Sequence, residues 1–369
     1  MRGNWRWTVL ATVRRSSSAA LVVVAALVGL LAAGRWLQPR LDHRTPEAPS
    51  TRPPLTSPAP TATTVATVAR PPGSQGITKT ADTDLVESIL VIGRSVWVTA
   101  GGWVVRVDPV TRRKVRVQEL GVQPATGRLA AADGAVWVAT ASQRLLRINP
   151  RTARVAASLA LPAQAIAADP SGVWAVCCGA GGRSGQLTRV EPASGRIVKA
   201  IRLPGHPEAV GIGSSGVWVR GAEGLLWRID PTSYRVVATI RLPSSNGQSY
   251  RADTGGPGGD IAVTRDAVWV SNPATATVRR IDPRRNQVSD DLWEADGSDL
   301  TVAANGVVWA TSDTRLLGLG GSEVLGPRRN LHELATDRIT AAAAARDGGL
   351  WLGTAQGLFH VTGSVLREG

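Results

Sequence analysis

Residues 214–243 read SSGVWVRGAEGLLWRIDPTSYRVVATIRLP, and this stretch decides the fold. A Ser- and Gly-bearing turn leads into a short apolar strand around Trp218, and the next alternating run stops at Asp230 and Pro231. Proline fixes φ and cannot continue a central strand, while aspartate caps a turn. Alternation resumes in YRVVATIRL, so the stretch predicts three successive strands joined by turns.

The unit around Trp218 recurs along the chain from residue 85 onward. Its tryptophans are Trp97, Trp137, Trp174, Trp218, Trp269, Trp309 and Trp351, with spacings of 40, 37, 44, 51, 40 and 42 residues. A short apolar run precedes each tryptophan, as at 89–92, 166–168 and 261–263, which gives four strand-like runs per unit. Repeats of about 40–45 residues with four strands are typical of propeller blades. We therefore predict an all-β fold, a seven-bladed β-propeller of four-stranded antiparallel blades.

The seven tryptophans are expected to be structural. One four-stranded sheet cannot cover both of its faces, so blades packed radially bury their faces against two neighbours and place these side chains between blades. The acid-Pro turn closes the first five units, at Pro109, Pro150, Pro192, Pro231 and Pro283. Units six and seven carry 316–319 and 358–361 instead. Terminal units of closed repeats are often degenerate, so the predicted count stays at seven.

The N-terminus carries a targeting signal. Residues 19–34 read AALVVVAALVGLLAAG, and with 16–18 they supply roughly the 20 residues needed to cross a bilayer. Arginines before the run favour a cytoplasmic N-terminus. Two other interpretations stay open, a signal peptide cleaved near Gly34 and a loose twin-arginine signal at Arg14 and Arg15. All three interpretations place the residues after 38 outside the cytoplasm.

A linker is expected to follow, because nine prolines stand among Thr, Ala and Ser between residues 38 and 76. Such a stretch buries too little apolar surface to offset its ordering entropy, so it predicts a disordered, semi-extended stalk. The predicted organisation is a cytoplasmic tail at 1–15, a transmembrane signal-anchor at 16–37, the linker at 38–76 and the propeller at 77–369.

Composition argues against a nucleic-acid partner in spite of a formal net charge of +14. Residues 1–76 hold nine Arg against two acids, and the rest of the chain holds 33 basic against 26 acidic residues. No basic run or basic helix follows residue 76. Two adjacent cysteines, Cys177 and Cys178, leave open either a vicinal disulfide or two half-buried thiols.

The repeat VWV…RIDP.T..VV.TI.LP resembles the YVTN/quinoprotein-like propeller repeats of bacterial envelope proteins and, more distantly, the streptogramin lyases, over residues 85–369. The motif is specific for the fold and poor for function. The resemblance to the lyases implies a metal site with a His and a Glu near the central opening. The chain has only His43, His206, His332 and His360, and the sequence around His206, LPGHPEAV, matches the lyase pattern poorly.

The top face of the propeller is the expected working surface. The links between blades and the turns after the tryptophan strands emerge there, and they include the two largest insertions, 178–186 and 244–259. The first residues of the inner strands should ring the channel: Ser88, Arg128, Ala165, Ala209, Asp260, Asp299 and Ala341. The candidate ligand-binding residues are Asp260, Asp299, Glu208, Arg128, Tyr250 and His206. Their carboxylates suit a divalent cation, Ca²⁺ or Mg²⁺, or a cationic group such as an amine; alternatively they are solvated rim residues or pair with Arg128, Arg251 or Arg265.

Two functions follow as expectations. The first is a monomeric, membrane-tethered, non-enzymatic binding or sensing scaffold whose top face meets a small ligand or a protein of the cell envelope. The second is a metal-assisted enzyme of the lyase or lactonase type with its site at the channel mouth. The first leads because no nucleophile–His–acid set and no His-rich metal site is visible in the sequence.

Overall fold

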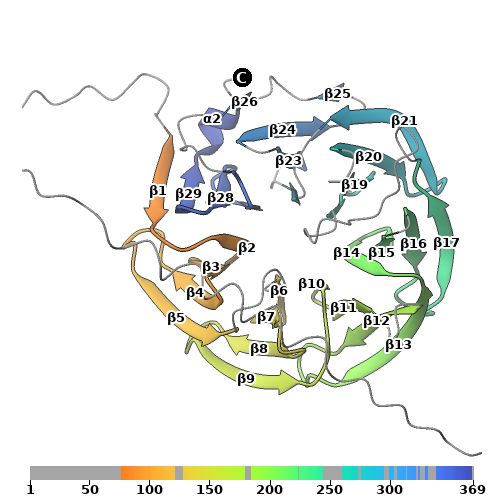
Figure 1. Cartoon of the computed structure of the whole chain (residues 1–369), viewed down its shortest axis with the longest axis horizontal. Helices are drawn as coiled ribbons and strands as arrows, with labels where there is room; N and C mark the ends of the chain where they lie inside the picture. The colour runs from red at the N-terminus through yellow and green to blue at the C-terminus, as the bar shows by residue number, and fades with distance from the viewer. Residues whose placement is uncertain are drawn as a thin grey trace, which may run out of the picture. The chain divides into compact units, whose positions relative to one another are not determined.

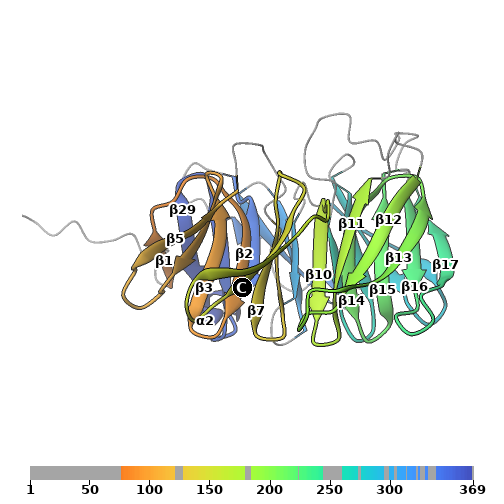
Figure 2. The same cartoon turned by 90° about the horizontal axis from the view of Figure 1, so that it is seen from below.

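The computed structural model forms a ring of seven blades around a central channel (Figure 1). The structure describes residues 76–120, 128–178, 184–222, 224–243, 260–272, 276–294, 299–302, 306–312, 314–320, 323–324, 329–330 and 338–367. Seen from the side, the strands run between the two faces of the ring (Figure 2). The predicted seven-bladed propeller of four-stranded antiparallel blades is confirmed.

Each of the first six blades takes its strands in chain order, from the inner to the outer edge. Blade 1 holds β2 (Val86–Ile92), β3 (Ser95–Ala100), β4 (Trp103–Val107) and β5 (Lys114–Glu119). Blade 2 holds β6 (Leu129–Ala132), β7 (Ala135–Ala139), β8 (Leu145–Asn149) and β9 (Arg154–Leu159). Blade 3 holds β10 (Ala165–Asp169), β11 (Gly172–Cys178), β12 (Ser184–Val190) and β13 (Ile197–Pro204).

Blades 4 and 5 repeat this plan, and blades 6 and 7 differ from it in the outer strand. Blade 4 holds β14 (Pro207–Gly213), β15 (Gly216–Gly221), β16 (Leu225–Ile229) and β17 (Val236–Arg241). Blade 5 holds β18 (Ile261–Val263), β19 (Val268–Asn272), β20 (Thr277–Asp282) and β21 (Gln287–Glu294). Blade 6 holds β22 (Leu300–Val302), β23 (Val308–Ser312) and β24 (Arg315–Gly320), whose outer edge pairs with β25 (Glu323–Val324) and β26 (Arg329–Asn330). Blade 7 holds β27 (Ala341–Ala344), β28 (Leu350–Thr354) and β29 (Gly357–Val361).

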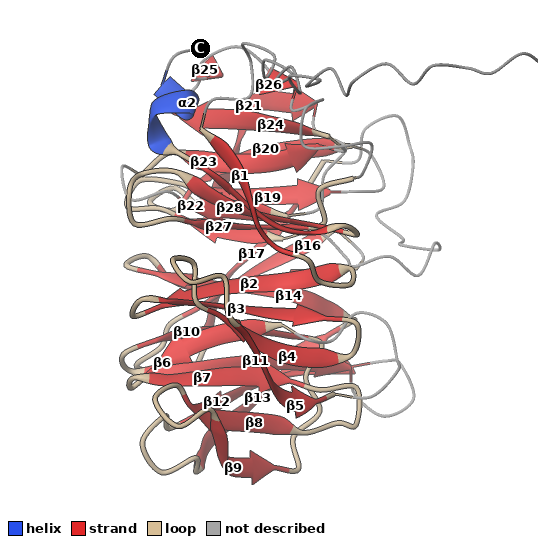
Figure 3. Cartoon of the chain, turned by 90° about the vertical axis from the view of Figure 1, so that its left-hand side faces the viewer, coloured by secondary structure: helices blue, strands red, loops and turns tan. Residues whose placement is uncertain are grey.

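The ring is closed by the N-terminal strand β1 (Ile77–Ala81), which forms the outer strand of blade 7. It pairs antiparallel with β29, with Ile77 opposite Val361 and Thr78 opposite His360. At the same junction the hydroxyl of Thr340 donates a hydrogen bond to the carbonyl of Val86 in blade 1. Both ends of the propeller therefore lie in one blade. A single helical turn, α2 (Gly363–Arg367), follows β29 (Figure 3).

The tryptophans of the second strands lie between blades. Trp97, Trp137, Trp174, Trp218, Trp269, Trp309 and Trp351 are all buried. Each packs against the blade that follows: Trp97 contacts the cluster with Val136 and Val138, and Trp351 packs against Val96 and Val98 of blade 1. The same relation around the whole ring makes seven equivalent interfaces, and their burial is the main apolar contribution to stability.

An arginine of the third strand joins consecutive blades. Arg228 lies over the ring of Trp218, with its Cζ 5.5 Å from the ring centroid, and Nη1 donates to the carbonyl of Pro283 at 2.6 Å in the next blade. Arg106 donates in the same way to the carbonyl of Pro150 at 3.1 Å. In blades 1 and 4 the arginine that precedes the acid-Pro turn thus reaches the acid-Pro turn of the following blade. Blades 6 and 7 lack that turn.

The acid-Pro turns are capped by their own side chains, as the sequence predicts. Oδ1 of Asp108 accepts hydrogen bonds from the backbone N–H groups of Val110 and Thr111, at 2.9 and 3.0 Å. Oδ1 of Asn149 accepts from Arg151 and Thr152 at 2.9 and 3.2 Å. These bonds hold the pKa of the Asp108 carboxyl below its usual range. The turns lie between the third and fourth strands, on the face opposite the channel mouth.

Some expectations lie outside the described residues. These include the tail at 1–15, the signal-anchor at 16–37, nearly all of the linker, the insertion at 244–259 and the side chain of Cys178. Among the residues that the structure does describe, no helix is both long enough and apolar enough to cross a membrane. The other predicted insertion is shorter than expected, because β12 begins within it, at Ser184.

Candidate functional site at the channel mouth

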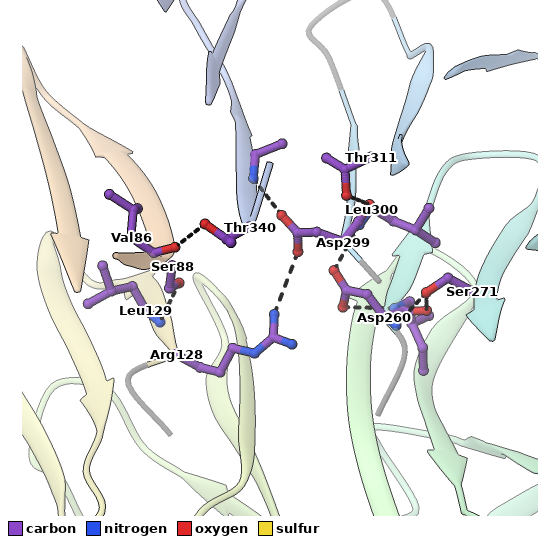
Figure 4. A network of polar contacts seen from close by, with 12 residues as sticks. Val86, Ser88, Arg128, Leu129, Asp260, Ser271, Asp299, Leu300, Thr311 and Thr340 are labelled. Carbon is purple, nitrogen blue, oxygen red and sulfur yellow. Dashed lines mark hydrogen bonds and ion pairs between the residues drawn. The ribbon is translucent and has the colours of Figure 1, made fainter. Parts of the chain in front are cut away.

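The seven inner strands line a central cavity of about 310 Å³. Many of its lining residues are aliphatic, but Ile89, Ile166, Val210, Ile261 and Leu300 are buried in the packing between blades, so most of the surface exposed to the cavity is polar. The charged residues that line it are Arg128, Asp260 and Asp299, each at the first residue of an inner strand or directly before it. A small charged group thus stands at the mouth of the cavity (Figure 4).

Asp260 is fixed by bonds on both sides. Its backbone N–H donates to the hydroxyl of Ser271 at 2.7 Å. Its Oδ1 accepts from the N–H of Ile261 at 2.8 Å, and its Oδ2 accepts from the N–H of Leu300 in the next blade at 3.2 Å. The carboxyl of Asp260 thus faces blade 6, on the side where Asp299 lies.

Asp299 occupies the equivalent place one blade further on. Its Oδ2 accepts a hydrogen bond from the N–H of Ala342 in blade 7 at 2.5 Å, and the backbone carbonyl accepts from the N–H of Thr311 at 3.1 Å. The side chain is only 13% exposed. The two carboxyl groups are hydrogen-bonded to each other, which requires a proton between them.

Burial raises the pKa of Asp299 to about 8, and the negative charge of Asp260 acts in the same direction. Two carboxylates held side by side with little water cannot both ionise cheaply. The guanidinium of Arg128 opposes this shift from across the channel, where Nη1 lies 3.6 Å from Oδ1 of Asp299. At neutral pH the group therefore holds one proton, one carboxylate and one guanidinium, so its charges cancel.

The mouth residues also join neighbouring blades. Oγ of Ser88 accepts a hydrogen bond from the N–H of Leu129 at 3.2 Å, which is the relation that Asp260 has to Leu300 and Asp299 has to Ala342. In each case a side chain at or near the start of one inner strand binds the backbone of the next. Sequence reasoning missed this role, although three polar residues at equivalent repeat positions were a signal for it.

The other candidate residues are not brought to this group. Glu208 lies at an irregularity in the pairing of β14 with β15, between Pro207 and Ala209. Its Oε2 lies 2.8 Å from Nη1 of the buried Arg220, so the carboxylate is directed into blade 4 and away from the cavity lining. His206 lies in the link before β14, where its carbonyl accepts from the N–H of Ala222 at 2.8 Å. Tyr250 lies outside the described residues.

The residues at the mouth do not fit the metal site that a likeness to the lyases implies. Among the described residues, no group of three or more His, Cys, Asp or Glu side chains is placed to hold an ion. Calcium takes six to eight oxygen ligands, and here two carboxyls stand beside a guanidinium. His360, in β29, stacks on Trp351 with ring centroids 4.5 Å apart and is not a lining residue of the cavity.

No family model and no curated protein matches this chain. Among solved structures, virginiamycin B lyase from Staphylococcus aureus is similar, with a TM-score of 0.60 and 16% identity over 78% of this chain and 98% of that one. A catalytically inactive His-to-Ala form of the same lyase with quinupristin gives a TM-score of 0.61 at 16% identity, with the same coverage. The distant similarity to streptogramin-lyase propellers expected from the sequence is thus confirmed at the level of fold.

Proposed function

We propose that the protein is a membrane-tethered, extracytoplasmic binding propeller whose channel mouth takes a small organic cation. The observation that carries this proposal is the carboxyl pair of Asp260 and Asp299 at the mouth of a cavity of about 310 Å³, where Asp299 has a pKa of about 8 and keeps its proton at neutral pH. A protonated amine can take the place of that proton and accept both carboxylates as partners.

The exchange of a proton for a cation keeps the charge of the site constant. With the amine bound, two carboxylates face one ammonium group and the guanidinium of Arg128, so the charges cancel as they do without ligand. A doubly charged metal ion would leave an excess positive charge beside Arg128. The chemistry of the site therefore favours a monoamine over Ca²⁺ or Mg²⁺.

The tether is supported by the sequence. The apolar run at 19–34 and the arginines before it favour a signal-anchor with its N-terminus in the cytoplasm. The described propeller begins in β1, at the outer edge of blade 7. A cytoplasmic tail of about 15 residues is too short for a signalling domain, so a response to ligand would pass through a partner protein.

Calorimetric titration of the full chain with a series of primary alkylammonium ions, from methyl to hexyl, tests the proposal. Every member should bind with similar affinity, because the ammonium group makes the recognised contact and most of the surface exposed to the cavity is polar. Asp260→Asn should weaken binding of every member. A matched control is Asp266→Asn, whose carboxylate is 71% exposed on a turn of blade 5. No binding by wild type, or equal affinity in Asp260→Asn, would overturn the proposal.

A further inference from the structure

The outer strands of blades 2, 3 and 4 expose apolar side chains to solvent. Five of the seven large apolar residues exposed in the described part of the chain lie on β9, β13 and β17: Val155, Ile197, Val198, Val236 and Val237. The exposed fraction reaches 49% at Ile197 and 53% at Val237. These strands follow one another along the outside of the ring (Figure 1). Outer strands are sheet edges, and exposed apolar side chains on an edge strand are unusual in a soluble protein.

The same strands are basic. Exposed arginines and lysines on these strands or within three residues before them are Arg151, Arg154, Arg196, Lys199, Arg202, Arg235 and Arg241. No acidic residue lies in 151–159, 196–204 or 235–241. By contrast the outer strand of blade 5, β21, reads QVSDDLWE and is acidic. We call β9, β13 and β17, with Arg196 and Arg235 directly before two of them, the basic rim; the outer strand of blade 1, β5, and the two residues before it continue the positive charge with Arg112, Arg113, Lys114 and Arg116.

We infer that the basic rim lies on the surface of a bilayer that contains anionic phospholipid. Phosphate groups complement the basic side chains, and exposed Val and Ile fit the boundary between headgroups and acyl chains, where lysine and arginine extend their charges toward water. Each basic residue near an anionic surface contributes about 1 kcal/mol. A protein partner with an acidic surface would shield the apolar side chains equally well. It is the alternative to a bilayer.

The curvature of the rim is compatible with a flat surface. A plane that touches β13 at the centre of the arc meets β9 and β17 at an angle, and long basic side chains reach it from both sides. Electrostatic attraction also acts over about 8–10 Å at moderate salt. In this orientation the channel axis runs along the membrane, so the mouth with Asp260 and Asp299 stays open to ligand.

The proposed tether keeps the propeller close to the bilayer, so weak contacts with lipid are sufficient. The inference rests on the proposed function only in this respect, because the tether sets the local concentration. A linker of roughly 39 residues at about 3.1 Å per residue reaches about 120 Å, so the ring always stays near the bilayer. At that effective concentration a few contacts suffice to hold the rim on the surface.

Hydrogen exchange of the full chain in proteoliposomes tests the inference. Vesicles of phosphatidylcholine alone are compared with vesicles in which a third of the lipid is phosphatidylglycerol. Amides of β9, β13 and β17 should exchange more slowly on the anionic vesicles, while those of β21 should not change. The protection should disappear at high salt, because exposed charges are then screened.

The double variant Lys199→Glu with Arg202→Glu should reduce the protection by about tenfold or more, since each basic side chain is worth roughly fivefold in binding. Arg284→Glu with Arg285→Glu makes the same charge change on an exposed turn of blade 5 and should leave the protection intact. Equal exchange on both kinds of vesicle would overturn the inference. Protection that grows with protein density on phosphatidylcholine would indicate contact between copies and would also overturn it. Loss of the protein from washed vesicles would instead refute the tether, and ammonium binding would be unaffected by either result.

Discussion

The guanidinium of Arg128 in blade 2 lies 3.6 Å from the carboxyl of Asp299 in blade 6, so an ion pair spans the mouth of the channel. These blades are not neighbours, and the ring alone brings the two residues together. Two effects on the pKa of Asp299 therefore compete: the charge of Arg128 lowers it, and burial beside Asp260 raises it. Burial dominates, and Asp299 keeps its proton at neutral pH.

This protonation predicts a pH dependence of stability. The pKa of Asp299 rises from 3.8 in the unfolded chain to about 8 in the fold. Between pH 4 and pH 8 the folded state therefore binds more protons than the unfolded chain. The contribution of Asp299 to the free energy of unfolding is fully present below pH 4 and decreases as the pH rises to 8. The slope is at most about 1.4 kcal/mol per pH unit. Asp299→Asn, which resembles the protonated acid, should gain stability relative to wild type over this range.

Denaturant unfolding of both proteins from pH 4 to 9 measures this difference. Asp266→Asn serves as the control, because its exposed carboxylate should give a difference that does not vary with pH in the same way. A constant difference between Asp299→Asn and wild type across the range would show that the carboxyl pair does not share a proton.

Replacement of a tryptophan tests the packing between blades. Trp218→Ala removes a fully buried ring that packs against Val268 and Val270 of blade 5, and should cost about 3–5 kcal/mol of unfolding free energy. Trp103 is half-buried in β4 outside the repeat position, so Trp103→Ala should cost clearly less. Urea unfolding of both variants provides the measurement. Small and equal losses would contradict a core built from the tryptophans of the second strands.

Ring closure depends on β1. A chain that begins at residue 83 lacks this strand and leaves the edge of β29 unpaired, so it should unfold at lower denaturant and self-associate through the free edge. A chain that begins at residue 76 keeps all of β1 and should match the full-length propeller in thermal melting. Light scattering and melting curves compare the two. Equal behaviour would mean that β1 is dispensable.

The proposed topology is open to a direct assay in cells. Residues from 39 onward should be accessible to protease in intact spheroplasts, and the protein should sediment with membranes. This follows from the apolar run at 19–34 and its preceding arginines. Recovery of a soluble mature protein that begins at Arg35 would refute the signal-anchor while leaving export in place.

Much of the fold could be predicted from the sequence, because each blade repeats one physical solution. The tryptophan before a third strand that ends in arginine, acid and proline recurs wherever a blade must pack on the next, as around Trp218 and Arg228. Closure could not be predicted. The strand ITKTA of β1 carries neither a tryptophan nor a turn motif, and only its partner β29, far along the chain, gives it a place.

The candidate site could be predicted in part for a similar reason. Repeat alignment places Asp260, Asp299 and Arg128 at the mouth, and the structure brings them together. Glu208 is adjacent to an equivalent position in sequence, yet an irregularity in β14 directs it to Arg220. Such an irregularity depends on how one strand meets its neighbour, and no residue type in LPGHPEAV marks it.

The central claim is that an organic cation replaces the proton shared by Asp260 and Asp299. Titration calorimetry of the full chain with hexylammonium at pH 7, in two buffers of different ionisation enthalpy, counts the protons released on binding. Wild type should release close to one proton per bound ligand, because Asp299 has a pKa of about 8 and is largely protonated at pH 7. Asp299→Asn should bind more weakly and release almost none. Binding of hexylammonium with no proton release by wild type, or no binding at all, would contradict the account.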